Sequence, residues 1–140
     1  MQVIILRHAH AEWPSYSGAD FDRPLTARGL AEARSSARAI SDAGHRPAFL
    51  LVSPARRTRQ TAEILAEEFQ LGPECVHYVD SLYNASSSTL AAELKAATKA
   101  GDTALLVAHN PGVSDLVRDL GNHPATQSLK TAEWRLLPLR

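Results

Sequence analysis

Short apolar runs alternate along this chain with longer stretches in which apolar positions recur at helical spacing. The runs predict strands at 3–6, 49–52, 76–79, 104–108 and 129–137. The run at 76–79 has the weakest pattern. In the last run, the segment Lys-Thr-Ala-Glu-Trp-Arg alternates in polarity, which is typical of a strand at the edge of a sheet.

The longer stretches predict a helix between each pair of consecutive strands. The first helix has Thr26 as its N-cap and Gly44 as its stop signal. The second closes at 72–73 (Gly-Pro), and the third lies between a serine cluster at 86–88 and Gly101. The apolar positions that define the four helices are, in chain order, Leu30, Ala33, Ala37 and Ile40; Leu65 and Phe69; Leu90, Leu94 and Ala97; and Val113, Leu116, Val117 and Leu120.

This alternation of strand and helix predicts an α/β fold, a three-layer α/β/α sandwich with a mainly parallel central sheet and one edge strand. At 140 residues the chain is expected to form a single domain over 1–140, which is long enough to bury a core without disulfides. Ligands of such sheets bind outside the carboxyl ends of the strands. The functional residues are therefore expected at those ends.

Three of the predicted strand ends carry polar side chains of two kinds. The first strand ends in Arg7 and His8, the second runs into an arginine-rich segment at 53–57, and the fourth ends at His109. Because the carboxyl ends of parallel strands lie at one edge of a sheet, we expect these side chains to meet.

Within the arginine-rich segment, Arg57 is the expected inward-pointing residue. It shares a helix face with Thr61 and Leu65, whereas Arg56 and Arg59 fall on other faces. The latter two are expected to face solvent or the rim of the site.

A metal site is the alternative for the first strand end, because His8 and His10 would point to the same face of a strand. Metal-dependent hydrolases that use this pair are barrels of about 250 residues, longer than this chain. The other histidines form no matching pair, and Arg7 would repel a divalent cation. No metal or cofactor is expected, and His10 is expected at the rim.

Arginine beside histidine suits a phosphoryl group better. A guanidinium group matches phosphate oxygens bidentately and keeps its charge at working pH. A neutral imidazole can attack phosphorus when one ring nitrogen is free and the other is held by a hydrogen bond. The chain has no Gly-rich loop followed by Lys-Ser/Thr, so a P-loop nucleotide site is not indicated.

Composition narrows the classes of partner. Fifteen basic and fifteen acidic residues cancel, so a general affinity for nucleic acid or an anionic membrane is not expected. A single cysteine, Cys75, excludes an internal disulfide, and the sequence has neither a basic leader nor a long apolar run. We therefore expect a cytoplasmic protein, and a monomer.

Four ordered motifs carry a resemblance to a known family. The segments LRHAHAEW, DRPLTARG, SPARRTRQTAEIL and LLVAHNPG are similar to motifs of the histidine phosphatase superfamily, also called phosphoglycerate mutase-like. The small size and the RPLT segment resemble its SixA-type phosphohistidine phosphatase branch. The likeness runs from residue 2 to about residue 134.

The resemblance implies a role for each matching residue. His8 would be the nucleophile that becomes phosphorylated, Arg7 and Arg57 would bind the phosphoryl group, and His109 would be the second imidazole on its oxygens. Arg23 would be a further arginine at the rim. The family's usual glycine after Arg-His is replaced here by alanine at position 9, which would be strained if the backbone needs a positive φ there.

The resemblance leaves the proton donor open. Mutases and many phosphomonoesterases of this superfamily use a carboxylate to protonate the leaving oxygen, and the candidates here are Glu12, Asp20, Asp22 and Asp80. A phosphohistidine substrate relaxes this demand, because an imidazole that is already protonated leaves readily from a P–N bond.

The expected function follows from these points. We expect a metal-independent phosphatase that removes phosphate from phosphohistidine on a partner protein, such as a phosphotransfer domain or phosphocarrier. Short connections leave little chain for a lid, which fits an open site and a protein substrate. A phosphatase for small phosphomonoesters and a non-catalytic phosphate-binding module are the alternatives.

Overall fold

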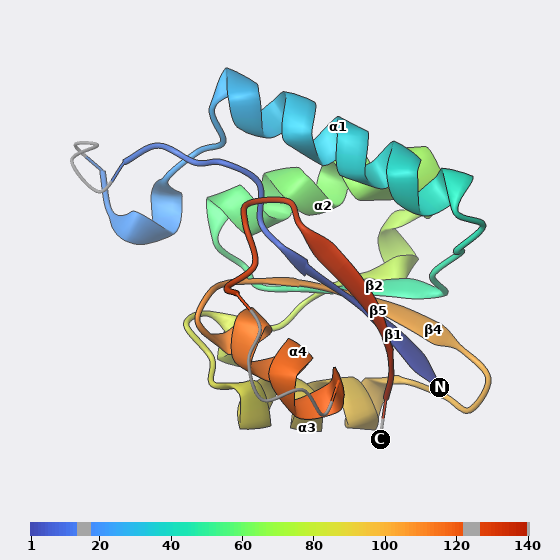
Figure 1. Ribbon diagram of the computed structural model, residues 1–140. Coiled ribbons are helices and arrows are strands. Elements are labelled where there is room, and N and C mark those ends of the chain that lie inside the picture. Colours follow the sequence, from blue (N-terminus) through green and yellow to red (C-terminus); the bar gives the residue numbers. More distant parts are fainter. Residues whose placement is uncertain (14–17, 122–126, 140) are drawn as a thin grey trace.

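The computed structural model describes residues 1–13, 18–121 and 127–139 (Figure 1). Its centre is a five-stranded sheet with the order β3-β2-β4-β1-β5. Four strands run parallel, and β5 pairs antiparallel with β1 at one edge. The strands are β1 (Gln2–Arg7), β2 (Phe49–Val52), β3 (Val76–Tyr78), β4 (Thr103–Ala108) and β5 (Trp134–Pro138).

Helices cover both faces of the sheet, which confirms the three-layer α/β/α prediction. Helices α1 (Ala27–Asp42) and α2 (Arg56–Phe69) lie over one face, and α3 (Ser87–Ala97) and α4 (Gly112–Gly121) lie over the other (Figure 1). None of the helices in the described part of the chain is long and apolar enough to cross a membrane.

The two helical layers explain the unbroken apolar run of β1. Val3 and Ile5 are buried in the apolar cluster that includes residues of α3 and α4, and Ile4 and Leu6 are buried in the one that includes residues of α1 and α2. Successive side chains of a strand point to opposite faces of the sheet. In a strand that is covered on both faces, every side chain is therefore buried, which favours apolar residues at every position.

The helix boundaries follow the predicted signals. The Thr26 side chain caps α1 by accepting a hydrogen bond from the Gly29 amide, and Gly44 has a φ of +85° just after the helix ends. Helix α2 ends at Phe69, and Gln70 adopts the left-handed conformation before the Gly-Pro pair at 72–73.

The predicted strand at 129–137 is wrong at its start, since β5 begins at Trp134. The preceding residues form a loop that folds against the end of β1, where the Leu129 carbonyl accepts hydrogen bonds from Arg7 Nη1 and Asn110 Nδ2. Ala132 has a φ of 59°, which breaks the extended conformation. The predicted strand at 76–79 is shorter by one residue.

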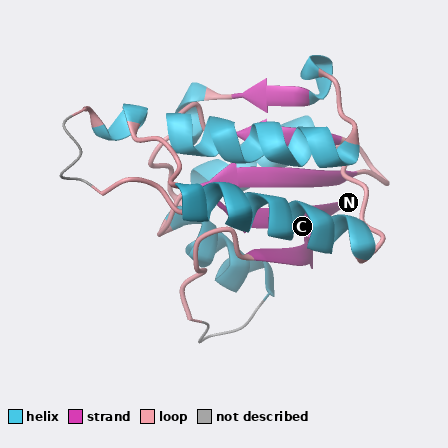
Figure 2. Cartoon of the chain, turned by 90° about the horizontal axis from the view of Figure 1, so that it is seen from above, coloured by secondary structure: helices cyan, strands magenta, loops and turns pink. Residues whose placement is uncertain are grey.

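The parallel strands finish together at one end of the sheet. The connection between β1 and α1, described at residues 8–13 and 18–26, projects from this same end (Figure 2). It contains a 3-10 helix, η1 (Asp20–Asp22), that contacts α2. This connection is longer than the short loops expected from the sequence, and it lies where ligands of parallel sheets bind.

A close backbone approach anchors the base of this connection. The Thr26 amide donates to the His10 carbonyl, and a Cβ atom added to Gly29 would overlap that carbonyl oxygen. Only a residue without a side chain fits this position, which holds the start of α1 against residue 10.

Gly29→Ala is therefore expected to destabilise the fold by about 1–3 kcal/mol, the usual cost of forcing atoms into packed space. The direction of the change in the free energy of unfolding is informative, because replacing glycine by alanine at an unobstructed helix position would stabilise the protein by about 1 kcal/mol. Urea denaturation followed by circular dichroism measures the change. The exposed Ser35→Ala on the same helix is the control, expected within about 0.5 kcal/mol of wild type.

Candidate active site

His8 follows β1 directly, with a buried, neutral ring. Nδ1 lies 2.7 Å from the Ala9 carbonyl oxygen, which can only accept, so Nδ1 carries the ring proton and Nε2 keeps its lone pair. Burial lowers the pKa of His8 to about 3, with further contributions from His109, Arg57 and Arg7. The ring has the form that a nucleophile at phosphorus requires.

Alanine fits at position 9 without strain. Positive φ at non-glycine positions of the described chain occurs at Gln70, Asn84 and Ala132, and not at Ala9. The Ala9 amide donates to Thr61 Oγ1, whose hydroxyl donates to the Arg57 carbonyl. This relay ties the end of β1 to the first turns of α2.

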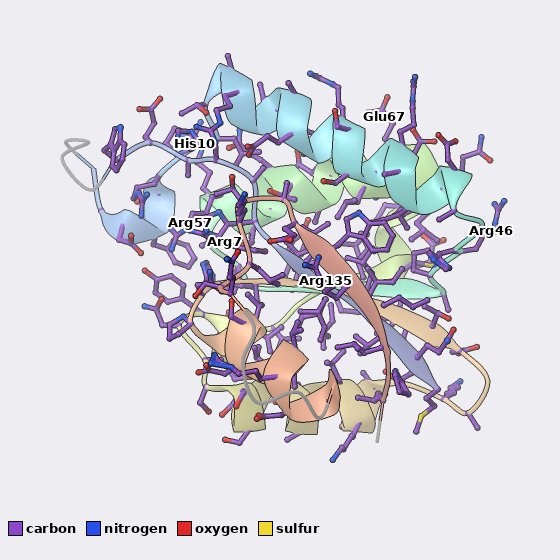
Figure 3. All side chains as sticks on the ribbon, viewed as in Figure 1. Arg7, His10, Arg46, Arg57, Glu67 and Arg135 are labelled. Carbon is purple, nitrogen blue, oxygen red and sulfur yellow. The ribbon has the colours of Figure 1, made fainter. Side chains whose placement is uncertain are left out.

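Arg57 is buried to 4% exposure and is held by Asp20. Its Nη1 donates to the Asp20 carbonyl over 2.8 Å, and its Nη2 donates to Asp20 Oδ2 over 3.2 Å. Arg7 donates from Nη1 to the Leu129 carbonyl over 3.1 Å. Figure 3 shows both arginines at the end of the sheet where the parallel strands finish. In each, the buried Nε–H has no partner among the described residues.

His109 completes the cluster from the end of β4. Its ring centroid lies 5.4 Å from that of His8. Ser53, which follows β2, places its hydroxyl 2.7 Å from His109 Nε2, and the buried Nδ1 has no partner among the described residues. Burial lowers the pKa of His109 to about 4, with Arg57 adding to the effect. When the Ser53 hydroxyl donates to Nε2, the ring proton resides on Nδ1.

A rim formed by η1 and the residue after η3 (Asp80–Leu82) lies beside this cluster. Asp20 Oδ1 accepts from Arg23 Nη1 over 2.9 Å, and Asp20 Oδ2 also accepts from the Tyr83 hydroxyl. The Tyr83 ring lies 5.6 Å from that of His109. The bond from Tyr83, with help from Arg23 and Arg57, holds the pKa of Asp20 well below its usual range.

The structure thus brings together Arg7, His8, Arg57 and His109, and places Arg23 next to them through Asp20. Arg23 is held by the Glu12 carbonyl, which accepts from its Nε over 2.6 Å.

Other candidates from the sequence lie elsewhere. Arg56 and Arg59 are exposed, and Arg59 stacks over the Tyr78 ring. Of the carboxylate candidates, Asp22 and Asp80 are exposed, and Asp20 is the one bonded to the arginines.

Ser53 and Tyr83 were not singled out from the sequence. Ser53 could have been found, because it is the first residue after a buried strand. Tyr83 carries no such signal, since its place depends on how the segment after β3 folds across the strand ends.

The paired-histidine metal reading finds no support in the described residues. His10 turns to Thr26, with Nδ1 2.8 Å from the Thr26 hydroxyl, and packs against Trp13. Within 1–13, 18–121 and 127–139, no group of three or more His, Cys, Asp or Glu side chains is arranged to hold a metal ion.

The unpartnered nitrogens define what the site can bind. In the described part of the chain, the buried side-chain nitrogens without a partner are Arg7 Nε, Arg57 Nε and His109 Nδ1. Buried polar atoms are nearly always bonded, so three unpartnered nitrogens in one cluster, two of them arginine N–H donors, indicate a place for an acceptor group. Two of the three belong to cations, so the acceptor that fits is an oxyanion next to the free Nε2 of His8.

Residues 3–83 match the model of the histidine phosphatase superfamily (branch 1). The chain belongs to this superfamily. The match spans the strand of His8 and the helix of Arg57, so the superfamily's sequence pattern includes two of the strand ends that meet in the structure.

Comparison with individual proteins supports the SixA-type branch of the superfamily. The SixA structure from Agrobacterium tumefaciens, assigned as a phosphohistidine phosphatase, is 32% identical, with a TM-score of 0.81 over 96% of this chain and 89% of that one. The protein histidine phosphatase SixA complexed with tungstate is 29% identical, with a TM-score of 0.82 over 97% and 86%.

A longer relative is known from a plant. An uncharacterised chloroplastic protein of Arabidopsis thaliana is 33% identical over 144 residues. The alignment takes in 97% of this chain, which spans 65% of the length of the plant protein.

The rings of His8 and His109 are expected to stay neutral from pH 8 down to about pH 5, because both pKa values lie below the ordinary value of 6.5. The unfolded chain then binds more protons than the folded chain below about pH 6.5. Stability should fall as the pH is lowered from there towards 3. NMR of the ring nitrogens measures both titrations.

His8→Ala and His109→Ala assign the two sets of ring signals in this experiment. A ring of either residue that titrates with a midpoint near 6.5 would contradict the buried, neutral arrangement.

Ser53→Ala is expected to lower kcat about tenfold, the effect of about 1.4 kcal/mol lost from orienting His109. The melting temperature should change much less than kcat does, because the lost hydrogen bond holds a ring of the site and does not join elements of the core. Phosphate release measures the effect, with the exposed Ser81→Ala as control. An unchanged kcat would show that the Ser53 hydroxyl does not position the ring.

Proposed function

We propose that this chain is a metal-independent phosphatase that works through a phosphorylated His8, and that its substrate is phosphohistidine on a partner protein. The observation that carries the proposal is the set of three unpartnered buried nitrogens, two of them arginine N–H donors, in one cluster with a neutral histidine that has a free Nε2. Membership of the superfamily and the likeness to SixA structures support phosphatase chemistry.

In the first step, the Nε2 lone pair of His8 forms a bond to phosphorus, and the bond from phosphorus to the leaving atom breaks. The electron pair of that bond stays on the leaving atom. Arg7, Arg57 and His109 donate to the phosphoryl oxygens, where charge develops in the transition state.

In the second step, water attacks phosphorus, the P–Nε2 bond breaks, and its electron pair returns to Nε2. The water gives up one proton to solvent as inorganic phosphate forms. The Ala9 carbonyl matters here, because it keeps the proton on Nδ1 and the phosphorylated ring is a cation. A ring that leaves phosphorus as neutral imidazole is a far better leaving group than an imidazolate.

The state of Asp20 favours phosphohistidine over phosphoesters. An ester oxygen needs a proton as it leaves, and the carboxylate bonded to the arginines is ionised because its pKa lies well below the usual range. In a protonated phosphoimidazole, the leaving ring already carries the proton that it needs. This rim therefore suits a substrate that requires no proton donor from the protein.

The same proposal covers the setting in which the chain acts. A phosphohistidine side chain is presented by a protein, such as a phosphotransfer domain or phosphocarrier, and we propose that the chain acts on it as a cytoplasmic monomer. The free, half-buried thiol of Cys75 fits a reducing compartment.

His8→Ala is expected to reduce release of inorganic phosphate by at least about 10³-fold, since it removes the nucleophile. Wild type and variant are compared on a phosphohistidine protein, glycerol phosphate and a sugar phosphate. The neighbouring exposed Arg56→Ala is the control and should retain activity.

Equal activity of wild type and His8→Ala would rule out the nucleophile assignment. Binding of phosphohistidine protein without any release of phosphate would favour a phosphate-binding module. Hydrolysis of the small esters alone would favour a phosphomonoesterase.

A further inference from the structure

A row of rings leads from the reacting histidine to the surface. His8 lies 5.4 Å from His109, His109 lies 5.6 Å from Tyr83, and Tyr83 lies 5.2 Å from Phe21, measured between ring centroids. Phe21 is 39% exposed. The Phe21 and Tyr83 rings meet edge to face. An aromatic surface therefore begins directly beside the second imidazole.

Asp20 adds an anionic group to this aromatic surface. Its side chain is 49% exposed although it bonds to Arg23, Arg57 and Tyr83. A carboxylate has about four lone-pair positions, and three donors occupy it here, so it can accept one more hydrogen bond. Oδ1 accepts from Arg23 alone, so the remaining acceptor capacity is on that oxygen.

These features are complementary to one kind of leaving group. An ionised carboxylate next to aromatic rings attracts a flat cation with an N–H donor. It would repel a leaving group that carries negative charge. A simple alcohol would gain from neither the rings nor the charge.

We propose that Asp20, Phe21 and Tyr83 form a leaving-group subsite that holds the substrate's phosphorylated imidazole in its protonated form. This inference rests on the proposed function. Asp20 accepts a hydrogen bond from the N–H of the ring nitrogen that is not phosphorylated, and the aromatic side chains contact the ring. When the P–N bond breaks, its electron pair stays on the nitrogen that carried the phosphoryl group. The ring leaves as neutral imidazole, with the N–H of the other nitrogen intact.

The subsite predicts how activity depends on the leaving group. A nearby carboxylate favours the protonated form of the substrate's ring, which is the form that leaves readily, so Asp20→Asn should shift the alkaline limb of the phosphohistidine pH profile to lower pH. At neutral pH its kcat/KM for free phosphohistidine should fall at least about tenfold more than its kcat/KM for glycerol phosphate. Its relative activity on 4-nitrophenyl phosphate, which has an anionic leaving group, should rise.

Phe21→Ala tests the aromatic part of the subsite without touching the arginines. It should raise KM for phosphohistidine about five- to tenfold, and leave glycerol phosphate unchanged. Trp13→Ala is the matched control, because Trp13 is an exposed aromatic residue of the same connection whose ring packs on His10. It should leave both substrates unchanged.

Two results would overturn the subsite. An equal loss on all three substrates in Asp20→Asn, with an unshifted pH profile, would mean that Asp20 only positions the arginines. An unchanged KM in Phe21→Ala would remove the aromatic contact. Failure of the proposed function is distinguishable, because wild type itself would then hydrolyse the esters and not phosphohistidine. That result would reject the subsite together with the function.

Discussion

The buried guanidinium of Arg57 is the constraint around which the rest of the site is arranged. A cation at 4% exposure needs an acceptor for each of its nitrogens, and Asp20 supplies two bonds, one from its backbone and one from its side chain. The remaining Nε–H has no acceptor in the described chain. Arg57 thus keeps one unpartnered donor in the cluster that contains the two histidines.

Hydrogen bonds around Arg57 connect three parts of the fold. The carbonyl of Arg57 accepts from Thr61, which in turn accepts from the Ala9 amide at the end of β1. Asp20 belongs to the connection between β1 and α1, whose base is fixed by Gly29 against the His10 carbonyl. The strand, the helix and the connection are therefore held to one another by hydrogen bonds that converge on Arg57, the first through its main-chain carbonyl and the last through its side chain.

The surroundings of His8 and Asp20 also determine where protons reside in the site. The Ala9 carbonyl fixes the proton of His8 on Nδ1, and burial beside cations keeps the ring neutral. Asp20 is held in the opposite state, as an anion, by its bond to Tyr83 and by the arginines. The site thus combines a neutral imidazole with an ionised carboxylate at its rim. In the proposed reaction, the proton on the leaving group therefore comes with the substrate.

The sequence alone determined the layered fold, because the apolar run of β1 and the spacing of the helices are local consequences of burial on both faces. It also placed Arg7, His8, Arg57 and His109 at strand ends, since ends of parallel strands share one edge. It did not determine the loop at 129–133 or the course of residues 8–13 and 18–26, whose conformations depend on distant bonds, such as those from Arg7 to the Leu129 carbonyl and from Arg57 to the Asp20 carbonyl. Only the tertiary structure decided that Ser53 bonds to His109 and that Asp20 bonds to Tyr83, because hydrogen bonds between side chains far apart in the chain leave no periodic pattern in the sequence.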